Sequence, residues 1–182
     1  LVVALVVFSA LVTYPLYSNE PANQLESIKQ QGVLKVLTLN AASTYYQDNN
    51  GANGFEYHLA RMFADSIGVE LKMKTVDKYA DIYPELIFNS GDIAAAGLSL
   101  QDGVKSNSIM FSEPYHQVKQ QLLYRKGHQQ RPREINDLDG GLLEVIDGTS
   151  HSQLLRRLQN DHPELSWRTN NDVATEELIE LV

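Results

Sequence analysis

The sequence predicts an α/β fold built around a parallel sheet. Three strand-like apolar segments, residues 33–39, 69–75 and 93–97, alternate with two segments at helical spacing, residues 55–67 and 78–89. Strands that alternate with helices are typical of βαβ units, in which the strands run parallel. Of the 182 residues, 43% are hydrophobic and 21% are charged, a composition that excludes disordered and fibrous proteins.

Residues 22–31 are expected to form a short amphipathic helix that stops at Gly32, since glycine is common just after a helix. The run at 33–39 is largely apolar, as in a strand whose two faces are both covered. The polar, glycine- and asparagine-rich residues 40–53 predict a loop.

The next helices and strands are predicted from the spacing of apolar side chains. Residues 55–67 carry apolar side chains at helical intervals and end at a glycine. Residues 69–75 alternate apolar and charged side chains, which indicates a half-exposed strand. Pro84 lies inside the helical segment 78–89, so we expect a break or a late start there. Small side chains form the strand at 93–97, where another group can approach closely.

A further strand is expected at 117–124, followed by a polar crossover at 125–139 that leads to a second unit. The elements expected there are a strand at 142–146, a helix from 148 to 158, a strand at 165–168 and a helix from Asn171 onward.

The N-terminal segment predicts attachment to a membrane. Residues 1–12 are apolar except for Ser9, and an aromatic end extends this run to Tyr17. We therefore expect a membrane anchor or uncleaved signal segment over 1–18 and export of the remainder to the periplasm. A buried core helix is the alternative, which Pro15 and the following polar stretch disfavour.

The chain begins with Leu1 in place of a methionine and ends within a helical pattern. We expect it to be part of a longer protein.

Net charge is −8, from 15 basic and 23 acidic residues, so nucleic acid is not an expected partner. The chain has no cysteine, which excludes disulfides, thiolate metal sites and cysteine nucleophiles. Its five histidines show no metal-ligand spacing. No metal and no cofactor are expected.

Four segments occur in a characteristic order: Gly54 to Ala60 (GFEYHLA), Ile67 to Val69 (IGV), Gly91-Asp92, and Phe111 to Tyr115 (FSEPY). This order resembles that of extracellular solute-binding proteins of the polar-amino-acid type. The resemblance implies a periplasmic, type II, bilobal fold, with lobe 1 at 19–126 largely present and lobe 2 at 127–182 truncated.

Four later segments, at 120–124, 131–133, 147–150 and 163–167, resemble the family of membrane-bound lytic murein transglycosylase F. In that family, which is associated with the outer membrane, a membrane-targeted solute-binding-like domain precedes a lysozyme-like domain that cleaves peptidoglycan. The resemblance implies a catalytic domain beyond residue 182, attachment to the membrane through residues 1–17, and a peptidoglycan or muropeptide ligand.

Lys105 departs from the pattern of the amino-acid binders, which have an arginine at this position that grips the ligand carboxylate. An ammonium group cannot make the bidentate contact of a guanidinium, so ordinary amino-acid binding is disfavoured. Lys105 is a candidate electrostatic anchor for a ligand, or else a solvated surface lysine.

Five further residues are candidates for ligand binding. Thr149 and Ser150 begin a predicted helix, whose N-terminus favours an anion, although residues of these types are also ordinary helix caps, which is the favoured interpretation. Tyr45 and Tyr46 could stack on a sugar or muropeptide, or pack locally. Ser99 follows the small-residue strand and faces either the cleft or solvent.

No catalytic residue is expected in this segment. Glycosidic cleavage needs a positioned carboxyl acid, and the related lyases carry it in a Gln-Glu-Ser motif. The one Glu-Ser pair here, Glu26-Ser27, falls on the amphipathic helix before the first strand.

These observations favour a regulatory binding module of a membrane-attached peptidoglycan lyase. The alternatives are a free-standing amino-acid or solute receptor of an ABC importer and the sensor domain of a membrane kinase or cyclase. Whether the full-length protein is an enzyme depends on sequence outside this segment.

Overall fold

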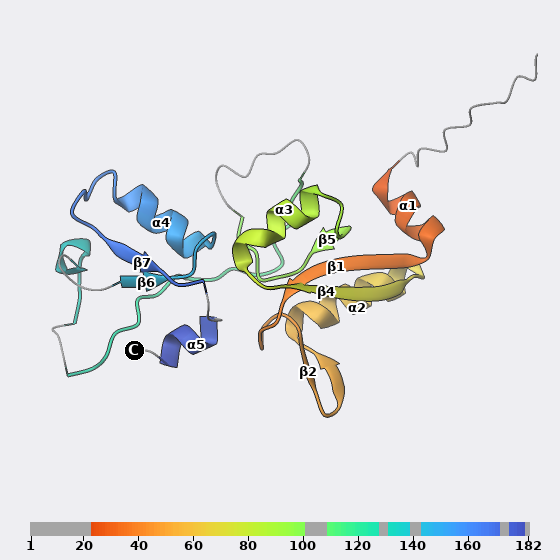
Figure 1. Ribbon diagram of the computed structural model, residues 1–182, viewed down its shortest axis with the longest axis horizontal. Coiled ribbons are helices and arrows are strands. Elements are labelled where there is room, and N and C mark those ends of the chain that lie inside the picture. Colours follow the sequence, from red (N-terminus) through yellow and green to blue (C-terminus); the bar gives the residue numbers. More distant parts are fainter. Residues whose placement is uncertain (1–22, 101–108, 128–130, 139–142, 172–174, 181–182) are drawn as a thin grey trace, which may run out of the picture.

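The computed structural model describes residues 23–100, 109–127, 131–138, 143–171 and 175–180. They form two lobes that lie side by side (Figure 1). We call residues 23–100 lobe 1, residues 131–180 lobe 2, and residues 109–127, which pass from one to the other, the crossover segment.

Lobe 1 is built on a parallel three-stranded sheet in the order β4-β1-β5. The central strand β1 (Val33–Leu39) pairs along its whole length with β4 (Glu70–Val76), in register from Val33 opposite Glu70 to Leu39 opposite Val76. The third strand, β5 (Ile93–Ala94), pairs with the middle of β1. The predicted α/β architecture with a parallel sheet is therefore confirmed for this lobe.

One face of the sheet packs against α2 (Phe55–Ile67). Ala60 and Ala64 on this helix are buried in one cluster with Leu34 and Val36 on β1. Their small side chains allow the helix to approach the strand closely, and the buried apolar area stabilises the lobe. The short helix α1 (Gln24–Gln31) adds Ile28 to the same cluster and ends at Gly32, as predicted.

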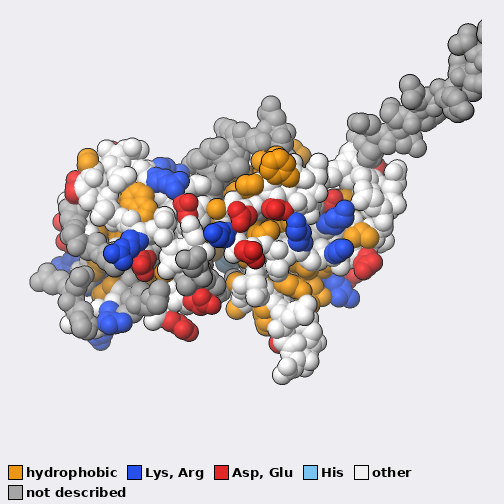
Figure 2. Space-filling view, viewed as in Figure 1, with side chains coloured by type: hydrophobic (Ala, Val, Ile, Leu, Met, Phe, Trp, Pro, Cys, Tyr) orange, Lys and Arg blue, Asp and Glu red, His pale blue; other side chains and the backbone are white. Residues whose placement is uncertain are grey.

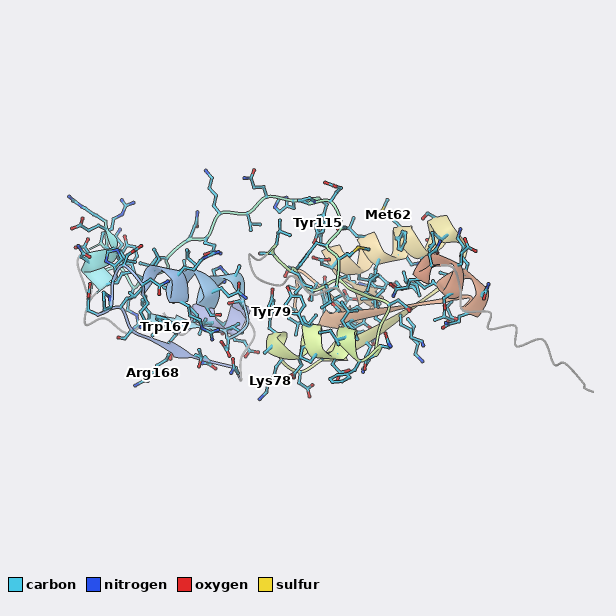
Figure 3. All side chains as sticks on the ribbon, turned by 90° about the horizontal axis from the view of Figure 1, so that it is seen from above. Met62, Lys78, Tyr79, Tyr115, Trp167 and Arg168 are labelled. Atoms are coloured by element: carbon cyan, nitrogen blue, oxygen red, sulfur yellow. The ribbon has the colours of Figure 1, made fainter. Side chains whose placement is uncertain are left out.

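The opposite face carries the 3-10 helix η1 (Tyr79–Asp81) and α3 (Ile82–Ile87), as Figures 1 and 3 show. Pro84 lies in the first turn of α3, where a missing backbone N–H is tolerated. The late start predicted from Pro84 is confirmed. Gly91 is needed on this side, because a Cβ atom there would lie 2.6 Å from Cγ of the buried Leu37.

The start of α2 is fixed by the loop that precedes it. The backbone N–H groups of Glu56 and Tyr57 donate to the carbonyl oxygens of Ser43 (3.4 Å) and Thr44 (3.1 Å). The first backbone N–H groups of an α-helix have no carbonyl partner within the helix, and these two contacts supply one. Gly54 permits the contact, because a Cβ atom there would lie 2.2 Å from the Thr44 oxygen and its φ is +126°.

Three expectations for this part of the chain are corrected. The predicted loop at 40–53 contains a hairpin of β2 (Tyr46–Asp48) and β3 (Gly51–Asn53), which projects from lobe 1 (Figure 1). The strand expected at 93–97 is only two residues long. The strand expected at 117–124 is absent, because none of the described strands lies beside this segment to accept its backbone hydrogen bonds.

Lobe 2 begins with a 3-10 helix, η2 (Ile135–Leu138), and repeats the strand-helix alternation. Its strands β6 (Leu143–Val145) and β7 (Trp167–Thr169) lie within a residue or two of the predicted strands and pair in parallel, and α4 (Ser150–Leu158) connects them. A last helix, α5 (Thr175–Glu180), follows.

The proposed membrane segment at 1–18 lies outside the described residues. Within the described ranges, no helix combines the length and apolar character that a membrane crossing requires. Acidic and basic side chains are interspersed over the face shown in Figure 2.

We predict that backbone amides of β6, β7 and α4 exchange with solvent faster than those of β1. Strand β1 has a partner on each side and helices on both faces, whereas β6 and β7 form a sheet of two strands. Short, half-covered sheets open more readily. Hydrogen exchange followed by mass spectrometry measures this, and equal protection in the two lobes would contradict it.

We also predict that Gly54→Ala destabilises the protein strongly. A side chain at positive φ costs about 1–2 kcal/mol, and displacing the Thr44 carbonyl adds about 1–3 kcal/mol. Gly32→Ala is the matched control, because its φ is +69° but its Cβ would have no neighbour within 4 Å. Urea denaturation of both variants gives the comparison, and equal losses of unfolding free energy would refute the steric argument.

Candidate functional site

A buried carboxylate organises the edge of lobe 1 at which the parallel strands end. Glu56 lies in the first turn of α2 and is only 5% exposed. Its Oε1 atom accepts a hydrogen bond from the backbone N–H of Gly97 (2.9 Å) and another from the hydroxyl of Tyr115. One oxygen atom therefore joins α2, the loop after β5 and the crossover segment.

The surroundings of Glu56 account for its burial. A buried carboxylate is costly unless hydrogen bonds replace its water shell, and hydrogen bonds to a charged acceptor are stronger than those between neutral groups. The first turn of a helix also favours negative charge through the helix dipole. The position and the two donors therefore offset the cost of burying this carboxylate.

Tyr115 presents half of its ring to solvent, 55% of the residue being exposed, and its hydroxyl to Glu56. Burial of the hydroxyl end raises the pKa of Tyr115, and the hydrogen bond to Glu56 and the charge of that carboxylate raise it further. The ring also contacts Phe55, with centroids 6.1 Å apart. Tyr115 therefore remains a hydrogen-bond donor over the whole physiological pH range.

Tyr79 lies just after β4, at the end of lobe 1 that faces lobe 2 (Figure 3). Burial is the main reason why its pKa is raised, and Tyr83 and Glu56 raise it further. The backbone N–H of Ser99 donates to the Tyr79 hydroxyl, which lowers that pKa in part. The loops that follow β4 and β5 are thus joined at this end of the lobe.

The two lobes meet where Gly148 approaches Ala80. A Cβ atom at Gly148, whose φ is +75°, would lie 3.2 Å from Cα and 3.3 Å from Cβ of Ala80. Since Gly148 immediately precedes Thr149, the N-terminus of α4 is held next to η1. This contact brings Thr149 and Ser150 to the same interlobe junction as Tyr79.

The turn before α4 is held in place by polar contacts within lobe 2. Arg156 forms an ion pair with Asp147 (2.7 Å), and the Asp147 backbone N–H donates to Oδ1 of Asn171 (3.1 Å). Both partners are substantially exposed, so the pair contributes little to stability. It fixes the direction from which the chain enters the helix.

Thr149 is the N-cap of α4, which confirms the structural interpretation of this residue. Its Oγ1 donates to the carbonyl of Ile146 (2.7 Å) and accepts from the N–H of Ser152 (3.4 Å). Ser150 is the first residue of the helix and is partly buried. A ligand contact by either residue remains a prediction.

Tyr45 and Tyr46 have described contacts within lobe 1. The ring of Tyr45 packs against Tyr57 (5.8 Å between centroids), and its hydroxyl accepts from Gln47 (2.9 Å). Tyr46 belongs to the projecting hairpin and pairs with Asn53. Packing within lobe 1 therefore accounts for the position of the Tyr45 ring. Stacking of Tyr45 or Tyr46 on a ligand remains a prediction.

Of the two remaining candidates, the structure describes Ser99 but not Lys105. Ser99 is partly buried and lies beside Tyr79, at the interlobe junction. Lys105 falls outside the described residues. Among the residues that the structure describes, no group of three or more His, Asp or Glu side chains is arranged to hold a metal ion.

Sequence analysis did not identify Glu56, Tyr79 or Tyr115 as site residues. Glu56 and Tyr115 lie in two of the ordered motifs, but their contact spans 59 positions, which no local pattern reveals. Tyr79 directly follows a predicted strand end, where ligands bind in parallel sheets. Its position directly after a predicted strand was the sequence signal that could have identified Tyr79 as a site residue.

We predict that the free energy of unfolding falls as the pH rises above about 10, the ordinary pKa of tyrosine. Above this pH the tyrosines of the unfolded chain lose their phenolic protons, whereas Tyr79 and Tyr115 retain theirs in the folded protein. The stability that these two residues contribute below about pH 10 is therefore lost as the pH rises toward their folded pKa values. Urea unfolding at about pH 8 and about pH 11 measures the loss. Tyr115→Phe should reduce it. Tyr124→Phe, at a residue of the same segment that is 43% exposed, is the control. A Tyr115→Phe protein with the parent's pH dependence would contradict the prediction.

Sequence comparison identifies relatives along most of the chain. It is 35% identical over 173 residues to the membrane-bound lytic murein transglycosylase F of Saccharophagus degradans, covering 95% of this chain and 34% of that protein. It is 40% identical over 164 residues to the protein of the same name from Stutzerimonas stutzeri, covering 90% of this chain and 33% of that protein. The chain thus spans about one third of the length of these curated relatives.

Two solved structures share the fold. One is an ancestral amino acid-binding protein, a precursor of cyclohexadienyl dehydratase, with a TM-score of 0.74 and 24% identity over 87% of this chain and 70% of that chain. The other is an amino acid ABC transporter substrate-binding protein from Streptococcus pneumoniae bound to L-arginine, with a TM-score of 0.72 and 23% identity over 86% of this chain and 65% of that chain.

These structures support the bilobal α/β fold that the ordered motifs predict. The sequence profile of the bacterial extracellular solute-binding proteins, family 3, matches residues 34–178, which include both lobes. The chain therefore belongs to the bacterial extracellular solute-binding proteins of family 3.

Proposed function

We propose that this chain is the ligand-sensing N-terminal module of a membrane-attached lytic murein transglycosylase. The observation that carries the proposal is its 35–40% identity, over about 90% of its length, to proteins of that name. The chain spans about a third of those relatives, and the proposal assigns the catalytic domain to sequence beyond residue 182. Cleavage of peptidoglycan is the proposed activity of the whole protein.

The proposed ligand is an anionic muropeptide bound at the interlobe junction. In this proposal lobe 1 contributes Ser99 and Tyr79 to the binding site, and lobe 2 contributes the N-terminus of α4 at Thr149 and Ser150. A helix N-terminus favours a carboxylate, and an aromatic ring packs well against an apolar sugar or peptide surface. Lys105 would add a positive charge.

Ligand binding would be reported to the catalytic domain through the relative position of the lobes. A ligand that touches both lobes stabilises the arrangement in which they are close, and a shift between two arrangements is a common form of signal. The contact between Gly148 and Ala80 is the described point at which the lobes approach.

The proposed location is the periplasm, with attachment to a membrane through residues 1–17. The apolar composition of that segment and the words "membrane-bound" in the names of the relatives support this part of the proposal.

The second candidate is a receptor that delivers a free amino acid to an ABC importer. The fold neighbour that carries L-arginine favours it. The two candidates differ in ligand chemistry, because a muropeptide adds a sugar and several carboxylates to the single amino acid that such a receptor would hold.

We predict that the chain binds a soluble anhydro-muropeptide more tightly than L-arginine in calorimetric titrations. Gly148→Ala should weaken muropeptide binding by about tenfold or more, equivalent to about 1.4 kcal/mol, because the added methyl group separates the lobes. Gly127→Ala is the matched control: its φ is +96°, but its Cβ would have no neighbour within 4 Å. Lys105→Ala should cost about 1–3 kcal/mol of binding if its ammonium pairs with a desolvated ligand carboxylate.

Binding of L-arginine without binding of the muropeptide would support the importer receptor instead. Equal affinities of Gly148→Ala and Gly127→Ala would remove the junction from the binding site. Unchanged affinity in Lys105→Ala would remove that lysine alone.

A further inference from the structure

The crossover segment contains no helix or strand over its described residues 109–127. Its path is therefore not fixed by a regular ladder of backbone hydrogen bonds. Side chains anchor it to lobe 1 at two places: Phe111 packs edge-on against Tyr83 (6.5 Å between centroids), and Tyr115 reaches Glu56. Figure 3 shows the segment leaving lobe 1 near Tyr115 and running to lobe 2.

Apolar burial holds this segment weakly. Val118 and Leu123 are 65% and 56% exposed, and Met110 is 94% exposed. Tyr115 is itself half exposed, so the hydroxyl contact with Glu56 is the directional part of its attachment. Hydrogen bonds to a charged acceptor are stronger than those between neutral groups, so this contact holds the segment more firmly than the burial of a half-exposed residue.

The same Glu56 oxygen also holds the backbone N–H of Gly97. Gly97 lies two residues before Ser99, which binds the hydroxyl of Tyr79 at the interlobe junction. A displacement of the loop after β5 therefore changes the position of the acceptor that holds Tyr115. The loop at the junction and the segment that connects the lobes share one acceptor atom.

We propose that Glu56 is a positioning residue that couples the loop after β5 to the crossover segment and thereby sets the relative position of the two lobes. It acts through Tyr115 and Gly97 and touches no ligand in this role. The inference goes beyond the proposed function, because it holds whichever ligand the junction binds.

The distance between the lobes can be measured directly, because the chain has no cysteine. Met62→Cys on α2 and Asn160→Cys after α4 place spin labels at exposed positions in the two lobes. Pulsed electron spin resonance then gives the distribution of interlobe distances in the full chain without ligand. A residue that serves only the stability of lobe 1 would not change this distribution.

Tyr115→Phe is the test variant, since it removes the hydroxyl and keeps the ring. Tyr57→Phe is its matched control, because it removes another tyrosine hydroxyl whose described side-chain partner, Arg61 (3.2 Å), lies on α2 and not in the crossover segment. We expect a wider interlobe distribution in Tyr115→Phe and the parent's distribution in Tyr57→Phe. Glu56→Gln keeps an oxygen acceptor without its charge, so a smaller widening is expected.

An unchanged distribution in Tyr115→Phe would overturn the proposal, as would an equal widening in Tyr57→Phe. If Tyr115→Phe fails to fold, judged by circular dichroism, Glu56→Gln decides: widening supports the coupling and the parent's distribution refutes it. No muropeptide enters these measurements, so their outcome is independent of the proposed ligand.

Discussion

The hydrogen bonds accepted by the buried carboxylate of Glu56 are the constraint on which one edge of lobe 1 depends, the edge at which its parallel strands end. They join the first turn of α2 to Gly97 and Tyr115, which lie 41 and 59 positions further along the chain. A buried charge is tolerated only when donors surround it. These segments must therefore be in place together, and the edge of the sheet is defined as one unit.

Backbone contacts at glycines supply the second constraint. Gly54 lets the Thr44 carbonyl reach the start of α2, Gly91 lets the chain before β5 pass close to the Leu37 side chain, and Gly148 lets lobe 2 approach Ala80. Asp92, which follows Gly91, accepts from the backbone N–H of Lys35 (2.8 Å) and so aligns β5 with β1. The residues of the family motifs thus have architectural roles in this protein, and their presence predicts the fold more directly than the ligand.

This separation explains why family membership and ligand identity are different questions here. The motif residues hold the sheet edge in position, while in the proposed function the ligand would contact the Tyr79 ring, the loop at Ser99 and the start of α4. These groups come from two lobes and three loops. Loops tolerate substitution without loss of the scaffold, so the same fold serves amino-acid receptors and, in the proposal made here, a sensor of cell-wall fragments.

The sequence by itself determined β1 at 33–39 and α2 at 55–67, whose bounds match the predictions, because apolar periodicity and a terminal glycine act within one element. It also determined that the strands of lobe 1 run parallel and that α3 starts late. Only the tertiary structure decided that 117–124 forms no strand, because pairing requires a neighbour that periodicity does not supply. The same holds for the contacts of Glu56 with Tyr115 and of Gly148 with Ala80: each depends on segments distant in sequence being brought within a few ångströms, which only the packing of the complete fold achieves.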